Sequence, residues 1–340
     1  MPRALKTLCL NLLLALASLI TCVAAMEVFL RATGLQPVGE ISPGIYRAAS
    51  DPVLSYELIP DLKKIAFRAT MTTNALGFRS PPLETGKPLV AFLGDSITFG
   101  YGVQDDETFP ARVQRLLPSV HVLNAAVPGY ALPQQAITFR EKVLPLNPSL
   151  LVHVFYWNDL TDKVAFLDED GVLRPQGWTR ENDRCDRLYG ILWYIPGQCW
   201  LDKNSAIYRV VKKIANRRYG NAWVEEEREK SATDPDYESL TAEQRDLYLA
   251  DLATYGQELP PDLPRVFVIW PDQEMHARLR EDIAIAAAAQ GFRVLDLYET
   301  FGNRVPLLGW DHVHAAPEAN VTAAEVLVEF LRTRNLLPEG

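Results

Sequence analysis

Five apolar runs of about strand length recur along the chain after residue 88: Leu89–Leu93, Val120–Leu123, Leu150–Phe155, Arg265–Ile269 and Phe292–Leu297. Segments with the apolar spacing of helices lie between or after these runs: Phe109–Leu117, Gln134–Leu144, Glu274–Gln290 and Pro317–Arg334. Continuous apolar strands that alternate with helices are typical of a parallel sheet covered by helices on both faces. The pattern therefore predicts an α/β domain built on a central parallel sheet.

The alternation is interrupted once, between the third and the fourth predicted strand. Residues 160–264 are polar, rich in aromatic residues and irregular. Within them, NSAIYRVVKKIANRRY has the apolar spacing of a helix, and the charge run Glu225–Lys230 is typical of a solvated helix face. An insertion of this size on an α/β sheet often forms a lid or a substrate-binding cap, and it can equally form a docking surface for a partner. The sequence leaves these alternatives open.

An uncharged apolar stretch, TLCLNLLLALASLITCVAAM, lies between Lys6 and Glu27. A helix of about twenty residues spans roughly 30 Å, which matches the hydrocarbon core of a bilayer. Because Arg3 and Lys6 precede it, the positive-inside rule places the N-terminus in the cytoplasm and the rest of the chain outside, in the periplasm if the cell is bacterial. We therefore predict a single-pass membrane anchor in residues 1–31. A cleaved signal peptide ending near Val23-Ala24-Ala25 and a buried helix of a soluble protein are the alternatives.

The remaining segments complete the predicted domain organisation. Residues 32–86 are rich in Pro, Gly and Thr, and they predict a stalk followed by a β-rich lead-in. The α/β domain then occupies residues 87–336 and contains the insertion of residues 160–264.

Composition narrows the class of partner. The 340 residues are 48% hydrophobic, which is ample for a core, and 34 basic against 43 acidic residues give a net charge of −9. No block of Lys and Arg stands out, which argues against nucleic acid, because its binding requires a concentrated basic face. The sequence does not define a protein partner.

Cysteine usage points to one candidate disulfide. Cys9 and Cys22 lie in the apolar N-terminal stretch, so that Cys185 and Cys199 remain, and export would allow them to be oxidised and paired. Two unpaired small apolar residues are the alternative. Neither these cysteines nor any His/Glu cluster has a metal-ligand spacing, and we expect no metal and no cofactor.

Residues suited to chemistry follow three of the predicted strands. Leu89–Leu93 ends in Gly94-Asp95-Ser96, the second strand is followed by NAAVPGY with Gly129, and the third by YWND with Asn158. In open α/β sheets ligands bind at the carboxyl ends of the strands. GWDHVHAAPE, just before the last predicted helix, adds Asp311 and His314.

These residues fit nucleophilic catalysis at an ester. A serine hydroxyl needs a base, and the base needs an orienting carboxylate, which predicts Ser96 as nucleophile, His314 as base and Asp311 as its partner. The tetrahedral intermediate needs hydrogen-bond donors for its oxyanion. The backbone N–H groups of Ser96 and Gly129 and the side-chain amide of Asn158 would supply them.

The order GDS, VPGY, ND and DHVH resembles the SGNH (GDSL-type) hydrolases. The resemblance spans Leu89–Phe155 and Arg265–Arg334, and it implies a flavodoxin-like three-layer sandwich with the site roles given above. The sequence departs from the family pattern at two positions. Ile97 replaces a leucine, a swap of one apolar side chain for another, and Tyr156 stands where a glycine usually precedes the asparagine by two residues, which is expected to narrow the pocket or shift Asn158.

Other candidates for the same chemistry are weaker. His312 neighbours Asp311 but is expected to point away from the serine, and His153 lies in an apolar strand and is expected in the core. We find no carboxylate signature for His121 or His276. Asp95 and Asp159 are expected to tie turns to backbone N–H groups. The Gly-x-Ser-x-Gly elbow of α/β-hydrolases is excluded, because Thr98 occupies its last glycine position.

The sequence thus predicts a membrane-anchored, extracytoplasmic serine esterase or acylhydrolase. Its substrate would be an acyl ester, with acetyl the expected acyl group, carried by a small molecule or a glycan. Small acyl groups on envelope glycans are the first candidate, and lipids are the second, because the anchor would hold the site near a bilayer. Two alternatives remain. One is an O-acyltransferase that passes the acyl group to a glycan hydroxyl, and the other is a non-catalytic envelope scaffold that keeps the fold.

Overall fold

The computed structural model describes residues 3–33, 44–161, 165–168, 173–175, 196–234 and 236–338. The chain divides into two compact units, Met1–Gly39 with Thr179–Ala222, and Glu40–Trp178 with Trp223–Gly340. The Cys185–Cys199 pair lies outside the described residues, because Cys185 and the side chain of Cys199 are not among them.

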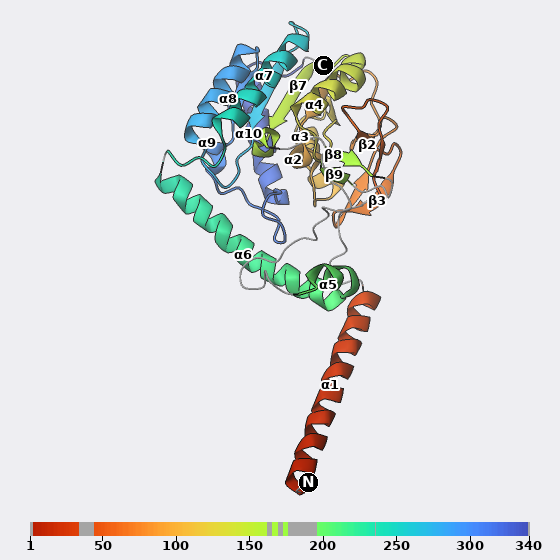
Figure 1. The fold of residues 1–340 in the computed structure, drawn as a ribbon. Coiled ribbons are helices and arrows are strands. Elements are labelled where there is room, and N and C mark those ends of the chain that lie inside the picture. The colour runs from red at the N-terminus through yellow and green to blue at the C-terminus, as the bar shows by residue number, and fades with distance from the viewer. Residues whose placement is uncertain are drawn as a thin grey trace. The chain divides into compact units, whose positions relative to one another are not determined.

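A five-stranded parallel sheet forms the centre of the second unit (Figure 1). Its order is β11-β10-β7-β5-β6, with β5 (Leu89–Leu93), β6 (His121–Asn124), β7 (Leu150–Phe155), β10 (Arg265–Ile269) and β11 (Arg293–Asp296). All neighbouring pairs are parallel. The five strands predicted from apolar runs are therefore confirmed, and their order is that of a flavodoxin-like sheet.

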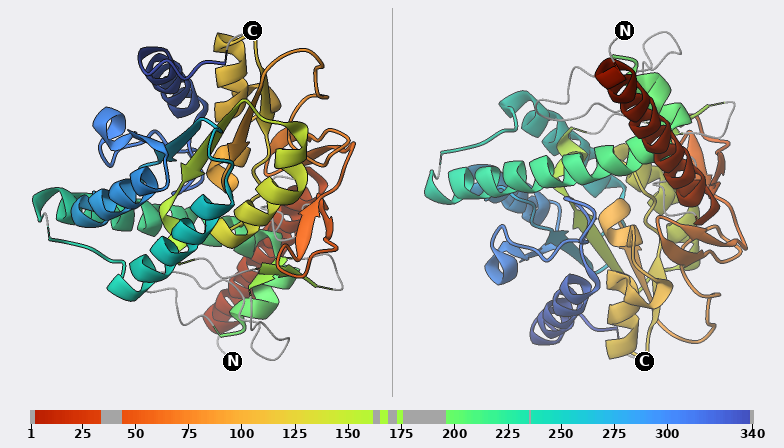
Figure 2. Two further views of the ribbon diagram at one scale, coloured as in Figure 1. Left: turned by 90° about the horizontal axis from the view of Figure 1, so that it is seen from above. Right: turned by 90° about the horizontal axis from the view of Figure 1, so that it is seen from below.

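Helices cover both faces of this sheet, as predicted (Figure 2). On one face α3 (Phe109–Leu116) packs against α10 (Pro317–Thr333). On the other, α7 (Ala242–Glu258) packs between α4 (Leu132–Thr138) and α8 (Ala277–Ala289). The apolar residues of β5 and β7 are buried along their whole length between these layers. The result is the three-layer sandwich that the alternation of runs indicated.

Two helix limits differ from the prediction for local reasons. The helix predicted over Gln134–Leu144 is α4 followed by a π-helical turn, η2 (Phe139–Val143), and then by the 3-10 turn η3 (Leu144–Leu146). The helix predicted from Glu274 begins only at Ala277. Its start is delayed because His276 has a left-handed backbone (φ 43°) and Asp272 accepts the N–H of Glu274 within a turn.

Short hairpins precede the sheet and pack against segments that follow two of its strands. β1 (Tyr46–Ala48) pairs with β2 (Tyr56–Leu58), and β3 (Lys63–Ala66) pairs with β4 (Ala69–Thr72). Their apolar side chains form a second buried cluster with residues of the loops after β5 and β6, including Phe99, Val127 and Tyr130. The Tyr56 hydroxyl donates to the Pro128 carbonyl at 2.7 Å. The described part of this lead-in therefore supports the loop that carries Gly129.

The insertion lies between β7 and β10, as predicted. It contains the antiparallel pair β8 (Ala165–Leu167) and β9 (Leu173–Pro175), then α5 (Gln198–Asn204), α6 (Ala206–Thr233) and α7. The charge run Glu225–Lys230 lies within α6. At the N-terminus, α1 (Arg3–Thr33) includes Leu5–Thr33, a segment long and apolar enough to cross a membrane by length and composition.

Candidate active site

Ser96 stands at the junction of β5 with a short helix, α2 (Ser96–Phe99). Asp95 caps this helix, because its carboxylate accepts the N–H of Ile97 at 2.8 Å. Gly94 makes the turn possible, since a Cβ on it would lie 2.3 Å from the Thr98 hydroxyl and 2.9 Å from the Val154 carbonyl oxygen. The sheet edge, the cap and the glycine thus hold Ser96 at the carboxyl end of β5.

His314 connects Ser96 to Asp311. Its Nε2 lies 2.9 Å from Ser96 Oγ, and its Nδ1 lies 2.9 Å from Asp311 Oδ2. The other oxygen of Asp311 accepts the backbone N–H groups of Val313 (2.7 Å) and His314 (2.8 Å). The aspartate therefore shapes the turn and orients the imidazole at once, and the structure brings the three predicted residues into one chain of hydrogen bonds.

The Asp311 carboxylate is held in its charged form. Burial raises its pKa, but the hydrogen bond and charge of His314 and the two backbone donors outweigh burial and lower the pKa to about 2. The Tyr101 ring stacks on the face of the His314 ring, with centroids 4.0 Å apart and planes inclined by 20°. Sequence reasoning missed Tyr101, which follows the serine by five residues with no pattern that marks a ring contact.

Gly129 and Asn158 follow the neighbouring strands. Gly129 has a left-handed backbone (φ 79°), and a Cβ there would lie 2.8 Å from the Tyr56 hydroxyl. Asn158 lies in η4 (Trp157–Leu160), and its Nδ2 donates to Asp95 Oδ2 at 3.0 Å. Because a side-chain amide carries two N–H bonds, this contact is compatible with donation to a substrate oxygen.

Asp95 joins these groups beneath the serine. Its Oδ2 lies 3.4 Å from Ser96 Oγ as well as 3.0 Å from Asn158. Burial raises the pKa of Asp95 above its usual value, against the hydrogen bonds it accepts. The expectation that Asp95 ties a turn to the backbone is confirmed, and its link to Asn158 adds a contact that the sequence did not indicate. Tyr156, where the family pattern has glycine, is buried in the main apolar core.

A match to a protein family decides the class of the chain. The model of the GDSL-like lipase/acylhydrolase family matches residues 92–320, more than half of the chain, and the match includes Ser96, Gly129, Asn158, Asp311 and His314. The chain belongs to this family. No curated protein matches it. Family membership assigns the chain to the acylhydrolases and esterases, and the SGNH-type fold predicted from the motifs is confirmed.

Solved structures of other hydrolases resemble the chain at low identity. The lipase/acylhydrolase from Enterococcus faecalis is 16% identical, and the match covers 74% of this chain and 99% of that one, with a TM-score of 0.42. An acetylxylan esterase from Geobacillus stearothermophilus, Axe2, is 17% identical over 76% of this chain and 97% of that one, with a TM-score of 0.37. Membership in the family follows from the family match alone.

Two other histidines of this GDSL-like chain lie in the core region. The His153 ring stacks on the Phe267 ring with centroids 5.3 Å apart and is fully buried, and burial lowers its pKa to about 3, so its predicted place in the core is confirmed. The expectation that it is a satisfied core residue is wrong, because neither ring nitrogen has a hydrogen-bond partner among the described residues. His121 is also buried, and its Nδ1 lies 3.8 Å from Glu84. This neighbour was not expected, because the sequence around His121 carries no carboxylate signature.

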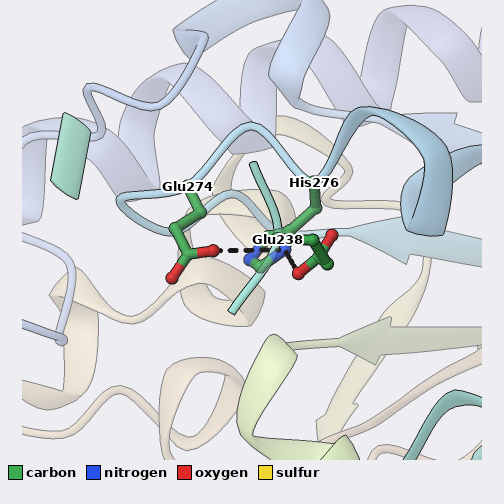
Figure 3. Close-up of side chains that lie close together, drawn as sticks. All are labelled: Glu238, Glu274 and His276. Carbon is green, nitrogen blue, oxygen red and sulfur yellow. Dashed lines mark hydrogen bonds and ion pairs between the residues drawn. The ribbon is translucent and has the colours of Figure 1, made fainter. Parts of the chain in front are cut away.

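His276 has carboxylate neighbours that were likewise not expected. Figure 3 shows it between Glu238 and Glu274, with its Nδ1 2.6 Å from Glu238 and 3.8 Å from Glu274. Its Nε2 lies 3.2 Å from Asp272. Burial lowers the pKa of His276, but the hydrogen bonds to Asp272 and Glu238 dominate and raise it to about 9. Asp272 and Glu274 stand four and two residues before His276, whereas Glu238 comes from the insertion, far from His276 along the chain, and only folding reveals that all three meet at one ring.

This cluster adjoins the active site through Trp157. The Trp157 ring stacks on His276 at 3.8 Å with an interplanar angle of 20°, and Asn158 is the next residue. Glu238, Glu274 and His276 place donor atoms within 4.8 Å of one another, a grouping within which a metal ion could be held. In the structure both ring nitrogens of His276 contact carboxylates. This is the arrangement expected of an imidazolium that is held by ion pairs.

Proposed function

We propose that the chain is a serine ester hydrolase that works through an acyl-enzyme. The observation that carries the proposal is the hydrogen-bonded chain from Ser96 through His314 to Asp311, with 2.9 Å at each step. His314 takes the proton of Ser96 as the hydroxyl oxygen attacks the acyl carbon, and it returns that proton to the departing alcohol. Water then attacks the acyl-enzyme along the same proton route, which releases the acid and restores Ser96.

The backbone N–H groups of Ser96 and Gly129 and the amide of Asn158 are proposed to stabilise the oxyanion. Each belongs to a residue that follows the carboxyl end of a parallel strand, where donors from neighbouring strands converge. The left-handed Gly129 supports this role, because that conformation turns a backbone N–H in a direction that a side-chain-bearing residue adopts only with strain.

The substrate is proposed to be an acyl ester, and an acetyl ester of a small molecule or of an envelope glycan is our first choice. This choice rests on the proposed location: Leu5–Thr33 anchors the chain in a membrane, and Arg3 and Lys6 keep its N-terminus in the cytoplasm. The catalytic unit then faces the extracytoplasmic side.

Resistance of the full chain to carbonate extraction, together with protease access from outside, tests the location. N-terminal sequencing of the mature chain separates an anchor from a cleaved signal.

The first activity experiment compares the full chain in detergent with Ser96→Ala, using p-nitrophenyl acetate. Ser119→Ala serves as the matched control, because Ser119 is exposed and lies outside the site. We expect turnover by the wild type and by Ser119→Ala, and none by Ser96→Ala. Equal turnover by Ser96→Ala would refute the serine mechanism. Stoichiometric acylation of Ser96 without turnover would instead support transfer to a glycan acceptor.

A further inference from the structure

Helix α6 separates its charges along its length. Between Asn204 and Val224 the sequence has no acidic residue and five basic ones, Arg209, Lys212, Lys213, Arg217 and Arg218. The three residues that follow Val224 are all glutamates. In a chain with a net charge of −9, the first half of α6 is thus a local basic region.

The same half of α6 exposes apolar side chains. Ile207, Val211 and Ile214 recur at the spacing of one helix face, and Val211 and Ile214 are 51% and 65% exposed. In the preceding helix, α5, Trp200 is 67% exposed. A helix that carries exposed apolar residues beside Lys and Arg is typical of segments that lie in the plane of a membrane interface.

The basic half is also the half that contacts α1. The Glu27 carboxylate accepts the N–H groups of Ala206 (2.7 Å) and Ile207 (3.0 Å) at the start of α6. Arg31 donates to the Asn204 carbonyl at 2.6 Å and pairs with Glu27. These bonds fix the start of α6 beside the last turns of α1 (Figure 1). Glu27 is the first charged residue after the apolar stretch, so this junction lies where a spanning α1 would leave the hydrocarbon core.

We propose that the first half of α6, residues 206–222, together with Trp200, is a membrane-interface surface that binds anionic phospholipid headgroups. Ile214 and Val211 would insert at the boundary of headgroups and acyl chains, while Arg217 and Arg218 contact phosphates. The inference rests on the proposed anchoring by α1, because the anchor brings this helix to a bilayer. An anionic bilayer complements the basic charge of this half of α6.

The entry of these side chains into the bilayer is tested with a tryptophan reporter. The full chain is reconstituted into vesicles of phosphatidylcholine with phosphatidylglycerol. Ile214→Trp places the reporter on the proposed surface, and Ile285→Trp is the matched control on α8, where Ile285 is 62% exposed. Lipids brominated on their acyl chains quench a tryptophan that reaches them. The fluorescence of the added tryptophan is the signal of each variant minus that of the wild type. We expect the brominated lipids to quench it about twofold in Ile214→Trp and to leave it unchanged in Ile285→Trp.

The headgroup contact is tested by reversing charge. Arg217→Glu/Arg218→Glu should reduce quenching of the Ile214→Trp reporter in anionic vesicles to its level in phosphatidylcholine alone. The control, Arg115→Glu/Arg278→Glu, makes the same change in net charge at two exposed arginines of the other unit, and it should leave the quenching of the reporter unchanged. Failure of the chain to float with carbonate-washed vesicles would overturn the anchor. A chain that floats while Ile214→Trp stays unquenched would retain the anchor and overturn the interface surface.

Discussion

The ring of Tyr101 stacks on the imidazole of His314, with centroids 4.0 Å apart and planes inclined by 20°. Tyr101 itself packs on Phe67 of the hairpin lead-in, at 4.2 Å. His314 is thus fixed in three directions, by Ser96 and Asp311 in the ring plane and by Tyr101 on its face. A base held in one orientation needs no rearrangement when it accepts the serine proton.

We expect Tyr101→Leu to lower kcat roughly tenfold with little change in KM, because the imidazole loses its flat support but remains hydrogen-bonded. Tyr101→Phe is the control, since it keeps the stacked ring, and it should retain most of the activity. Steady-state kinetics with p-nitrophenyl acetate measures both variants. Equal losses in the two would assign the effect to the hydroxyl and not to stacking.

Asn158 offers a second test, because it contacts Asp95 and is also a proposed oxyanion donor. Removing one such donor costs on the order of 3 kcal/mol in the barrier, so Asn158→Ala should lower kcat about a hundredfold and leave measurable turnover. Asn158→Asp sets a second carboxylate against Asp95 and should also lower Tm. Wild-type kcat in Asn158→Ala would remove Asn158 from the oxyanion hole.

The sequence was sufficient to predict what depends on local pattern. The apolar runs gave the strands, and Ser96, Asp311 and His314 could be paired because each lies in a short motif next to a strand end or the last helix. The burial of His153 followed from its apolar strand. In these cases the neighbours along the chain determine the environment of the residue.

Contacts between distant segments could not be predicted in the same way. The sequence around His276 does not indicate that the insertion brings Glu238 to its Nδ1. The sequence around Tyr101 likewise does not indicate that its ring contacts His314. The basic half of α6 was overlooked for a related reason. Its five Lys and Arg are spread over ten residues from Arg209 to Arg218, and the helix buries Lys212 while it exposes Arg217 and Arg218, so the surface exists only once the helix has formed.

Gly129 provides a prediction about backbone geometry. Alanine at this left-handed position costs about 1 kcal/mol, and its Cβ would also lie 2.8 Å from the Tyr56 hydroxyl, so that the loop must move. We expect Gly129→Ala to lower both Tm and kcat. Gly86→Ala is a matched control, because Gly86 is left-handed too (φ 85°) but has no atom within 4 Å of the added Cβ. A kcat loss shared by both variants would contradict a specific role of the Gly129 loop.

His276 predicts a dependence of stability on alkaline pH. Its pKa in the folded chain is raised to about 9, above the unfolded value of about 6.5, so its ion pairs stabilise the fold fully below the unfolded pKa, and this contribution is lost as the pH rises through 9. A pKa difference of this size corresponds to a contribution on the order of 3 kcal/mol. His276→Gln keeps a polar side chain but removes the titrating group.

The measurement is urea unfolding of the wild type and His276→Gln at pH 6, 8 and 10. The wild type should be more stable by that amount at pH 6, and the difference should shrink towards pH 10, because the neutral imidazole no longer pairs with Glu238 and Asp272. Lysines and tyrosines titrate in both proteins and cancel in the difference. Glu238→Gln should show a smaller effect of the same sign, since Asp272 and Glu274 remain beside the ring. A difference that stays constant from pH 6 to 10 would mean that His276 is neutral in the folded chain.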